Sequence, residues 1–139
     1  MQKAFTFFDT SGLKDDEIHL AVIETLGENE SQWRLPAYRF NICLNETGES
    51  VGYMSLRIGD NEFSRYIGHI GYEIDPDYRG NNYSLKAAIL ALQLARRHGM
   101  GRVTITANPD NFPSRHIIEK MGAKYEGTLQ IPPHLHSRF

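Results

Sequence analysis

The sequence predicts one α/β (α+β) domain over residues 1–139, built around a mixed sheet with flanking helices. Three observations lead to this fold class. Two β-rich runs joined by a turn occupy residues 37–59, a long amphipathic helix follows at Ser84–His98, and a strand, helix, strand pattern fills residues 102–131. With 40% hydrophobic and 23% charged residues, the composition is ordinary for a globular protein.

The first half of the chain is expected to hold one helix and three strands. Apolar residues at helical spacing, with three acidic residues at the start, predict a helix over Leu13–Leu26. Residues 37–45 and 50–59 predict a hairpin that turns at 46–49. Residues 65–76 predict the next strand. Its alternation places Tyr66, Ile70, Tyr72 and Ile74 on one face and Ile67, His69 and Glu73 on the other.

The second half begins with the most strongly predicted helix. Ser84–His98 has basic residues in its last turn, and Gly99 follows it as a helix stop. The β-branched residues of 102–109 predict a buried strand. Pro113 begins a short helix that runs to Met121, and residues 123–131 predict a closing strand.

Charge is distributed unevenly along the chain, although the net charge is only −2. Residues 1–78 hold six Lys/Arg and 14 Asp/Glu, whereas residues 79–139 hold nine and three. This division predicts that the second half meets an anion and that the first half attracts a cation, unless charge clusters here by chance. The basic residues are scattered and lack an aromatic stacking array, so nucleic acid is not an expected partner.

Several other classes of protein are also excluded. No apolar run approaches the roughly 18 residues of a membrane span, and the N-terminal stretch does not resemble a signal peptide. The one cysteine, Cys43, rules out an internal disulfide framework and is expected to be a buried strand residue rather than a nucleophile. His134 and His136 lack a recognisable third ligand, so no metal is expected. We therefore predict a cytoplasmic protein.

The stretch DPDYRGNNYSLKAA, residues 75–88, places a basic, glycine-containing turn between a strand and the strongest helix. Free N–H groups and the positive end of the helix dipole favour a phosphate there, and Arg79 adds a permanent charge. Gly80 lets the backbone approach a ligand closely. The stretch therefore predicts an anion site, and the alternative is an ordinary capped turn.

Two stretches resemble motifs of the GNAT acyltransferase superfamily. YEIDPDYRGNNYSLKA is similar to its acyl-CoA-binding motif, and NPDNFPSRHIIEKMGAKYEG is similar to the downstream motif of the branch that contains the ribosomal-protein N-terminal acetyltransferases. Together they cover roughly residues 66–129. The resemblance implies a mostly antiparallel sheet, acetyl-CoA as co-substrate and an amine acceptor.

The resemblance also implies roles for individual residues. The backbone of Ile74 and Asp75 would pair with the pantetheine arm as an added strand does. Arg79 and the amides of Gly80, Asn81, Asn82, Tyr83 and Ser84 would hold the pyrophosphate. Asn111 would bind the pantetheine and Arg115 a phosphate. The alternatives are that Asn111 and Ser114 cap the following helix and that Arg115 is a solvated surface charge.

Three positions depart from the family pattern. Asn82 and Ser84 stand where the family usually has small residues, and Asn tolerates left-handed backbone better than other non-glycine residues. Ile118 occupies the position of a tyrosine that protonates the leaving thiolate in many relatives. A thiol has a reference pKa of about 8.5, so water or Ser114 is the expected proton donor.

A neutral amine is required for attack, so we look for a general base. Glu73 and His69 share a face of the strand that leads into the turn. The alternatives are a surface carboxylate for Glu73 and a structural role for His69.

We expect an N-acetyltransferase that transfers the acetyl group directly in a ternary complex. The alternatives are an acyl-CoA-binding module without turnover and a structural interaction domain. The acidic residues Asp15, Asp16, Glu17, Glu28 and Glu30 favour a small cationic amine as acceptor, whereas the branch resemblance favours a protein N-terminus.

The last strand of the GNAT-like sheet is apparently missing, because only QIPPHLHSRF follows Leu129 and its prolines disfavour a central strand. The expected explanations are further C-terminal residues, an irregular tail, or a homodimer that donates a strand.

Overall fold

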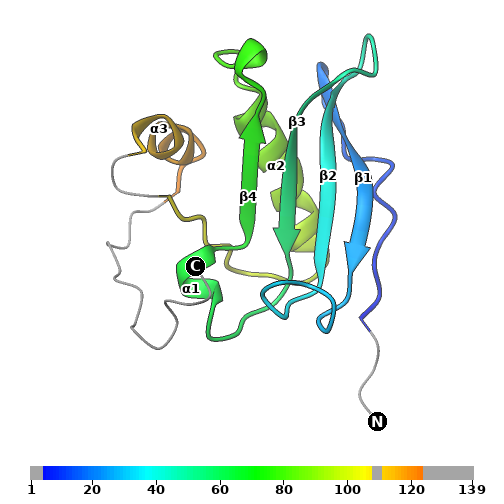
Figure 1. Ribbon diagram of the computed structural model, residues 1–139, viewed down its shortest axis with the longest axis vertical. Helices are drawn as coiled ribbons and strands as arrows, with labels where there is room; N and C mark the ends of the chain where they lie inside the picture. Colours follow the sequence, from blue (N-terminus) through cyan, green and yellow to red (C-terminus); the bar gives the residue numbers. More distant parts are fainter. Residues whose placement is uncertain (1–4, 108–110, 124–139) are drawn as a thin grey trace.

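The computed structural model describes residues 5–107 and 111–123. Four antiparallel strands form a sheet in the order β1-β2-β3-β4, with bounds Ile18–Leu26, Ala37–Leu44, Ser50–Arg57 and Ile70–Ile74. The helices are α1 (Ser64–Ile67), the 3₁₀ turn η1 (Pro76–Tyr78), α2 (Tyr83–Arg97) and α3 (Phe112–Lys120). Figure 1 shows α2 lying across one face of the sheet and α3 beside β4, on the side away from β3. This arrangement confirms the predicted mixed α/β fold.

The core lies between α2 and one face of the sheet. Cross-strand rows such as Phe40, Met54 and Tyr72 run over that face. The helix contributes mostly small residues, because Ala87, Ala88, Ala91 and Ala95 are fully buried beside Leu90 and Leu94. Small side chains let the helix axis approach the sheet closely, so α2 holds β4 and the turn that follows it in a fixed place.

The predicted helix over Leu13–Leu26 is wrong. Residues Ile18–Leu26 form β1, which pairs with β2 through a bulge between Val22 and Glu24. Ile18 and Leu20 are buried, at the two-residue period of a strand. The β-branched residues of this segment favour a strand, and the same apolar positions also satisfied a helical spacing.

The predicted hairpin is confirmed by β2 and β3, but the strand predicted over residues 65–76 is shorter than expected. Residues 64–67 form α1, and β4 begins only at Ile70. Gly68 separates the two with φ of 72°, and a Cβ there would lie 2.9 Å from the carbonyl oxygen of Thr104. The left-handed backbone and the close approach of residue 104 both require glycine.

The buried strand predicted over 102–109 is not formed within its described part, residues 102–107. There the backbone meets His69: the His69 N–H donates to the Thr104 carbonyl at 2.6 Å, and the Thr104 N–H donates to Nδ1 of His69 at 2.9 Å. The ring nitrogen of His69 thus accepts a hydrogen bond that a backbone carbonyl would accept in a regular sheet.

The two helices that were predicted in the second half of the chain are confirmed. α2 ends before Gly99, at φ of 82°, and α3 has Pro113 in its first turn and is followed by Gly122 at φ of 81°. None of the helices within residues 5–107 and 111–123 is long and apolar enough to cross a membrane. The strand predicted over 123–131 lies almost wholly outside the described residues, as do His134, His136 and the rest of the tail.

Candidate active site

The edge of β4 that faces away from β3 is the first element of the candidate site, and no strand within residues 5–107 and 111–123 pairs with it. The N–H of Asp75 donates to Val51 at 2.9 Å, and the carbonyl of His69 accepts from Arg57 at 2.8 Å, so odd-numbered residues of β4 pair with β3. Because antiparallel strands alternate, the N–H and C=O groups of Tyr72 and Ile74 point away from β3. Such an edge is a template on which an extended ligand can add as a strand.

The turn between η1 and α2 is the second element. Gly80 has φ of 89°, and Asn82, just before α2, has φ of 63°. The side chain of Asn82 makes no capping hydrogen bond at the N-terminus of α2, whose first backbone bond is donated by Lys86 to Asn82 at 3.0 Å. A Cβ built on Gly80 would meet nothing within 4 Å, so the turn is open. An uncapped N-terminus on a 15-residue helix fits a phosphate group.

Hydrogen bonds fix the residues around this turn. Arg79 donates from Nε to the carbonyl of Ile74 at 3.0 Å, which holds its guanidinium at the end of β4. Asn81 donates from Nδ2 to the carbonyl of Tyr78 at 3.0 Å. The hydroxyl of Tyr78 donates to Glu49 of the β2–β3 hairpin, and this bond raises the pKa of Tyr78. The residues that were predicted to bind phosphate therefore lie next to the strand edge that was predicted to bind the pantetheine arm, and the two meet at Ile74.

Helix α3 brings Ser114 to β4. The hydroxyls of Ser114 and Tyr72 lie 3.1 Å apart. Asn111 caps α3, because its Oδ1 accepts the N–H of Ser114 at 3.3 Å, so the structure supports the capping alternative for this residue. Arg115 is exposed on the first turns of α3. The sequence did not identify Tyr72 as a site residue. Its one distinguishing feature was a hydroxyl group among the apolar side chains on that face of the strand.

The two candidate bases lie in very different surroundings. His69 is 2% exposed; its Nδ1 accepts from Thr104, and its Nε2 donates to the carbonyl of Gly59 at 2.9 Å and faces Asp60 at 3.1 Å. Both ring nitrogens therefore serve structural contacts, with the proton on Nε2. Glu73 is exposed on the sheet face opposite to that of Tyr72, across from Tyr53 of β3. Of the two candidates, only Glu73 is open to solvent.

The acidic loop, Asp15, Asp16 and Glu17, does not start a helix, and its three carboxylates share one lysine as an ion-pair partner. Lys86 of α2 lies 3.7, 3.0 and 3.1 Å from these three carboxylates. The hydrogen bonds with Asp16 and Glu17 raise the pKa of Lys86, and the same lysine lowers the pKa of Asp16. The argument that this loop attracts a cationic acceptor is therefore weakened.

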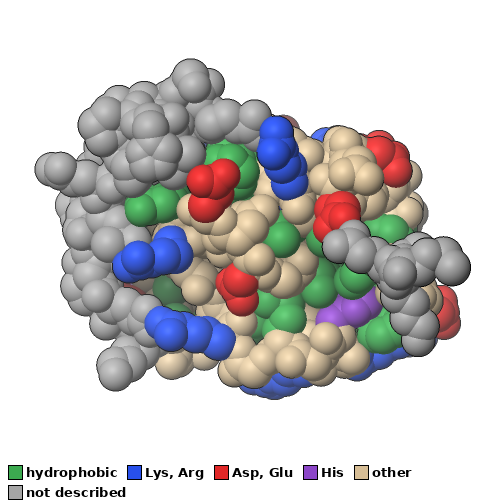
Figure 2. Space-filling view, turned by 90° about the horizontal axis from the view of Figure 1, so that it is seen from below, with side chains coloured by type: hydrophobic (Ala, Val, Ile, Leu, Met, Phe, Trp, Pro, Cys, Tyr) green, Lys and Arg blue, Asp and Glu red, His purple; other side chains and the backbone are tan. Residues whose placement is uncertain are grey.

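The remaining charges form no single-sign surface in the view of Figure 2, which looks at the end of the sheet where β1 and β3 finish. Lys/Arg and Asp/Glu side chains are interspersed there with apolar ones. Of the acidic residues that the sequence indicated, Asp16, Glu17, Glu28 and Glu30 are exposed, and the last two lie in the loop after β1 without a described ion pair.

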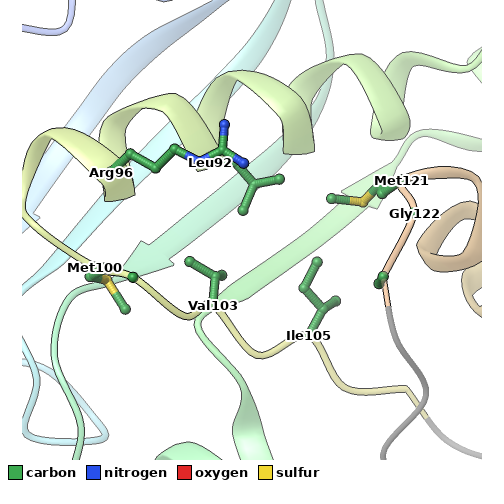
Figure 3. A pocket seen from close by; sticks show the side chains of 9 residues that line it. Leu92, Arg96, Met100, Val103, Ile105, Met121 and Gly122 are labelled. Carbon is green, nitrogen blue, oxygen red and sulfur yellow. The ribbon is translucent and has the colours of Figure 1, made fainter.

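A separate cavity of about 200 Å³ lies between α2, residues 102–107 and the end of α3. Figure 3 shows Leu92, Val103, Ile105 and Met121 around it, together with Arg96, which is the one charged residue among the described residues of the lining. These described residues offer no group for proton transfer near neutral pH, because an arginine stays protonated. None of them belongs to β4.

Comparisons with known proteins identify the family. Residues 3–124 match the family described as "Acetyltransferase (GNAT) domain". The uncharacterized N-acetyltransferase YnaD of Bacillus subtilis (strain 168) is 32% identical over 75 residues, which cover 50% of this chain and 44% of that protein, so less than half of the relative's length is matched. A crystal structure of a Trypanosoma brucei acetyltransferase is similar with a TM-score of 0.51 and 25% identity, covering 69% of this chain and 68% of that one. Since the family match extends over most of the sequence, the chain belongs to the GNAT acetyltransferase family.

Proposed function

We propose that the protein is an N-acetyltransferase that transfers the acetyl group of acetyl-CoA directly to an amine in a ternary complex. One observation carries the proposal: the edge of β4 that faces away from β3 leads within a few residues into the uncapped N-terminus of α2. An acyl-CoA molecule has the matching order of parts, with an extended amide-containing arm joined to a pyrophosphate. Backbone groups would hold the arm, and the helix terminus would hold the phosphates.

The proposed contacts follow this division. Ile74 is proposed to hold the arm through its backbone. The expected backbone role of Asp75 is wrong, because its N–H donates to Val51 at 2.9 Å and its carbonyl accepts from Tyr78 at 2.9 Å. Arg79 and the amides from Gly80 to Ser84 surround the pyrophosphate, and Arg79 supplies its fixed positive charge. Arg115 is exposed on α3 and is the proposed contact of a further phosphate. Asn111 contributes mainly by capping α3, which fixes Ser114 beside the arm.

Glu73 is the proposed general base. When acetyl-CoA is bound, its thioester supplies an activated carbonyl and a thiol leaving group. The amine nitrogen forms a C–N bond to the carbonyl carbon, and the C–S bond breaks with its electron pair going to sulfur. Glu73 accepts the proton that the nitrogen loses, directly or through water. His69 is instead proposed to hold residues 59–60 and 104 around the start of β4.

The acceptor is proposed to be an amine that is at least partly neutral near pH 7. An α-amine has a reference pKa of about 7.7–8.0, against about 10.4 for a lysine side chain. Lys86 offsets part of the negative charge of the acidic loop that would attract a small cationic amine, and the lower pKa of an α-amine makes a protein N-terminus the preferred acceptor. The resemblance to the ribosomal-protein branch supports the same choice.

The second candidate is an acyl-CoA-binding module without turnover. One observation favours it: Ile118 stands at the position of the usual tyrosine acid. This function requires the same β4 edge and α2 terminus but no proton-transfer groups.

The test is release of free thiol from acetyl-CoA in the presence of amines and N-terminal peptides. An N-acetyltransferase releases thiol only with an acceptor and yields an acetylated product of matching amount by mass spectrometry. CoA binding by calorimetry without turnover on any acceptor would favour the binding module. Absence of both binding and turnover would contradict each of these functions.

A further inference from the structure

The hydroxyl pair formed by Tyr72 and Ser114 joins two elements of the candidate site. The two oxygens lie 3.1 Å apart, although the residues are 42 positions apart in the sequence. Both side chains are half-buried, Tyr72 on the α2 side of β4 and Ser114 in the first turns of α3. In such a pair, one hydroxyl can orient the other, and the oriented hydroxyl can donate its proton to a third group.

The pair lies at the level that the reactive end of the arm would reach. Tyr72 precedes Ile74 by two residues, which is about 7 Å along a strand. An arm whose phosphates rest on the N-terminus of α2 and whose amides pair with Ile74 continues along β4 towards Tyr72. The thioester would then lie between the Tyr72 side chain on one face of the strand and Glu73 on the other.

The two hydroxyls differ in acidity. A phenol has a reference pKa of about 10, close to the value of about 8.5 for a thiol, whereas an aliphatic hydroxyl is a far weaker acid. Proton transfer to a thiolate is efficient only from a donor of similar pKa. Within the pair, the phenol is therefore the better proton source and the serine the better orienting partner.

Resting on the proposed function, we infer that Tyr72 is the acid that protonates the departing thiolate and that Ser114 is a positioning residue for it. This reverses the expectation that Ser114 itself is the donor and explains how Ile118 can stand at the usual tyrosine position. Tyr72 gives its O–H proton to the sulfur as the C–S bond breaks. It regains a proton from water, so that the products are the amide and the free thiol.

Three single variants test the inference. Tyr72→Phe removes the hydroxyl and keeps the ring, Ser114→Ala removes the orienting partner, and Tyr53→Phe removes a phenol exposed on the other face of the sheet. We expect kcat of Tyr72→Phe to fall by about 100-fold or more, with the KM for acetyl-CoA little changed. The kcat of Ser114→Ala should fall less. The kcat of the double variant should be no lower than that of Tyr72→Phe, because the two hydroxyls act as one unit.

A further readout separates proton donation from a structural effect. Independently of turnover, the thiol of bound CoA should have a lower pKa in the wild type than in Tyr72→Phe, because a donor hydroxyl stabilises the thiolate. The ultraviolet absorbance of the thiolate reports this pKa.

The inference is overturned if Tyr72→Phe keeps the kcat of Tyr53→Phe, or if the thiol of bound CoA titrates identically in wild type and Tyr72→Phe. Either outcome, in a wild type that acetylates amines, leaves the proposed function intact. A wild type that binds CoA but acetylates no amine would instead contradict the proposed activity. The thiol titration would still decide whether Tyr72 faces the sulfur.

Discussion

At the scale of single residues, the candidate site depends on groups that serve two purposes. Arg79 carries the charge expected at a phosphate site, yet its Nε also closes the end of β4 through the carbonyl of Ile74. Asn82 has the left-handed backbone that its place in the turn requires, and it leaves the helix N-terminus uncapped. Binding and local architecture are therefore coupled at this turn.

We predict that Arg79→Ala weakens CoA binding by about 10- to 100-fold, because a charge-assisted hydrogen bond contributes about 1.5–3 kcal/mol. Isothermal titration calorimetry measures the change. Arg65→Ala is the matched control, since Arg65 is an exposed arginine of α1, at the other end of β4 from the turn (Figure 1). Equal affinities of the two variants would show that Arg79 does not contact the ligand.

His98 gives a residue-level prediction about pH. Its ring stacks on Phe8 with centroids 4.0 Å apart, and its Nε2 lies 2.6 Å from the hydroxyl of Tyr38. That hydroxyl also accepts the N–H of Phe8 at 2.8 Å, and its own O–H can donate to Nε2 when His98 is neutral with its proton on Nδ1. Burial, and then the nearby Arg97, lower the pKa of His98.

A lowered pKa means that the unfolded chain binds this proton more readily than the folded one. The stabilisation is complete above the unfolded pKa of about 6.5 and is lost as pH falls through the lower folded value. We therefore expect the melting temperature to fall between pH 7 and pH 5, and to fall less in His98→Gln, whose side-chain oxygen can accept from Tyr38. An identical pH dependence in wild type and variant would contradict this role for His98.

At the scale of elements, the sequence predicted those whose signals are local. The β2–β3 hairpin, α2 and α3 were expected because turn residues, a helix stop and an N-terminal proline mark their ends. β1 was mistaken for a helix because its apolar residues satisfy two periods, and only pairing with β2 decides between them. Residues 102–107 were expected as a strand, but a His69 side chain takes a ladder position, which no local pattern indicates.

The packing of β3 on β4 supplies an element-level prediction. Gly52 lies opposite Ile74, and a Cβ on Gly52 would lie 2.3 Å from the carbonyl oxygen of Glu73. Gly52→Ala must push β4 away from β3 at the start of the proposed site. We expect a loss of about 1–3 kcal/mol in the free energy of unfolding, measured by denaturant titration, together with weaker CoA binding.

Gly12→Ala is the control for this variant, because a Cβ on Gly12 would meet no atom within 4 Å. Its stability should stay within about 0.5 kcal/mol of the wild type. A Gly52→Ala protein as stable as Gly12→Ala would show that the two strands are less closely packed than described.

At the scale of the whole molecule, the site is assembled from β4, the turn before α2, and α3. The turn was predictable because its residues are contiguous and their chemistry is local. The link between Tyr72 and Ser114 and the structural contacts of His69 were not predictable, because they join residues far apart in sequence. The contact of Lys86 with the acidic loop is of the same kind, and it changes the expected surface for an acceptor.

The most direct test of where acyl-CoA binds is amide hydrogen exchange with and without acetyl-CoA. Two ligands separate the two halves of the site, because acetyl-pantetheine has the arm and lacks the pyrophosphate. Acetyl-CoA should slow exchange at the amides of Tyr72 and Ile74 and from Gly80 to Ser84, whereas acetyl-pantetheine should protect only the β4 amides. The exposed edge strand β1 should be unaffected by either ligand. Protection confined to β1, or none at β4 and the turn under saturating acetyl-CoA, would contradict this account of the site.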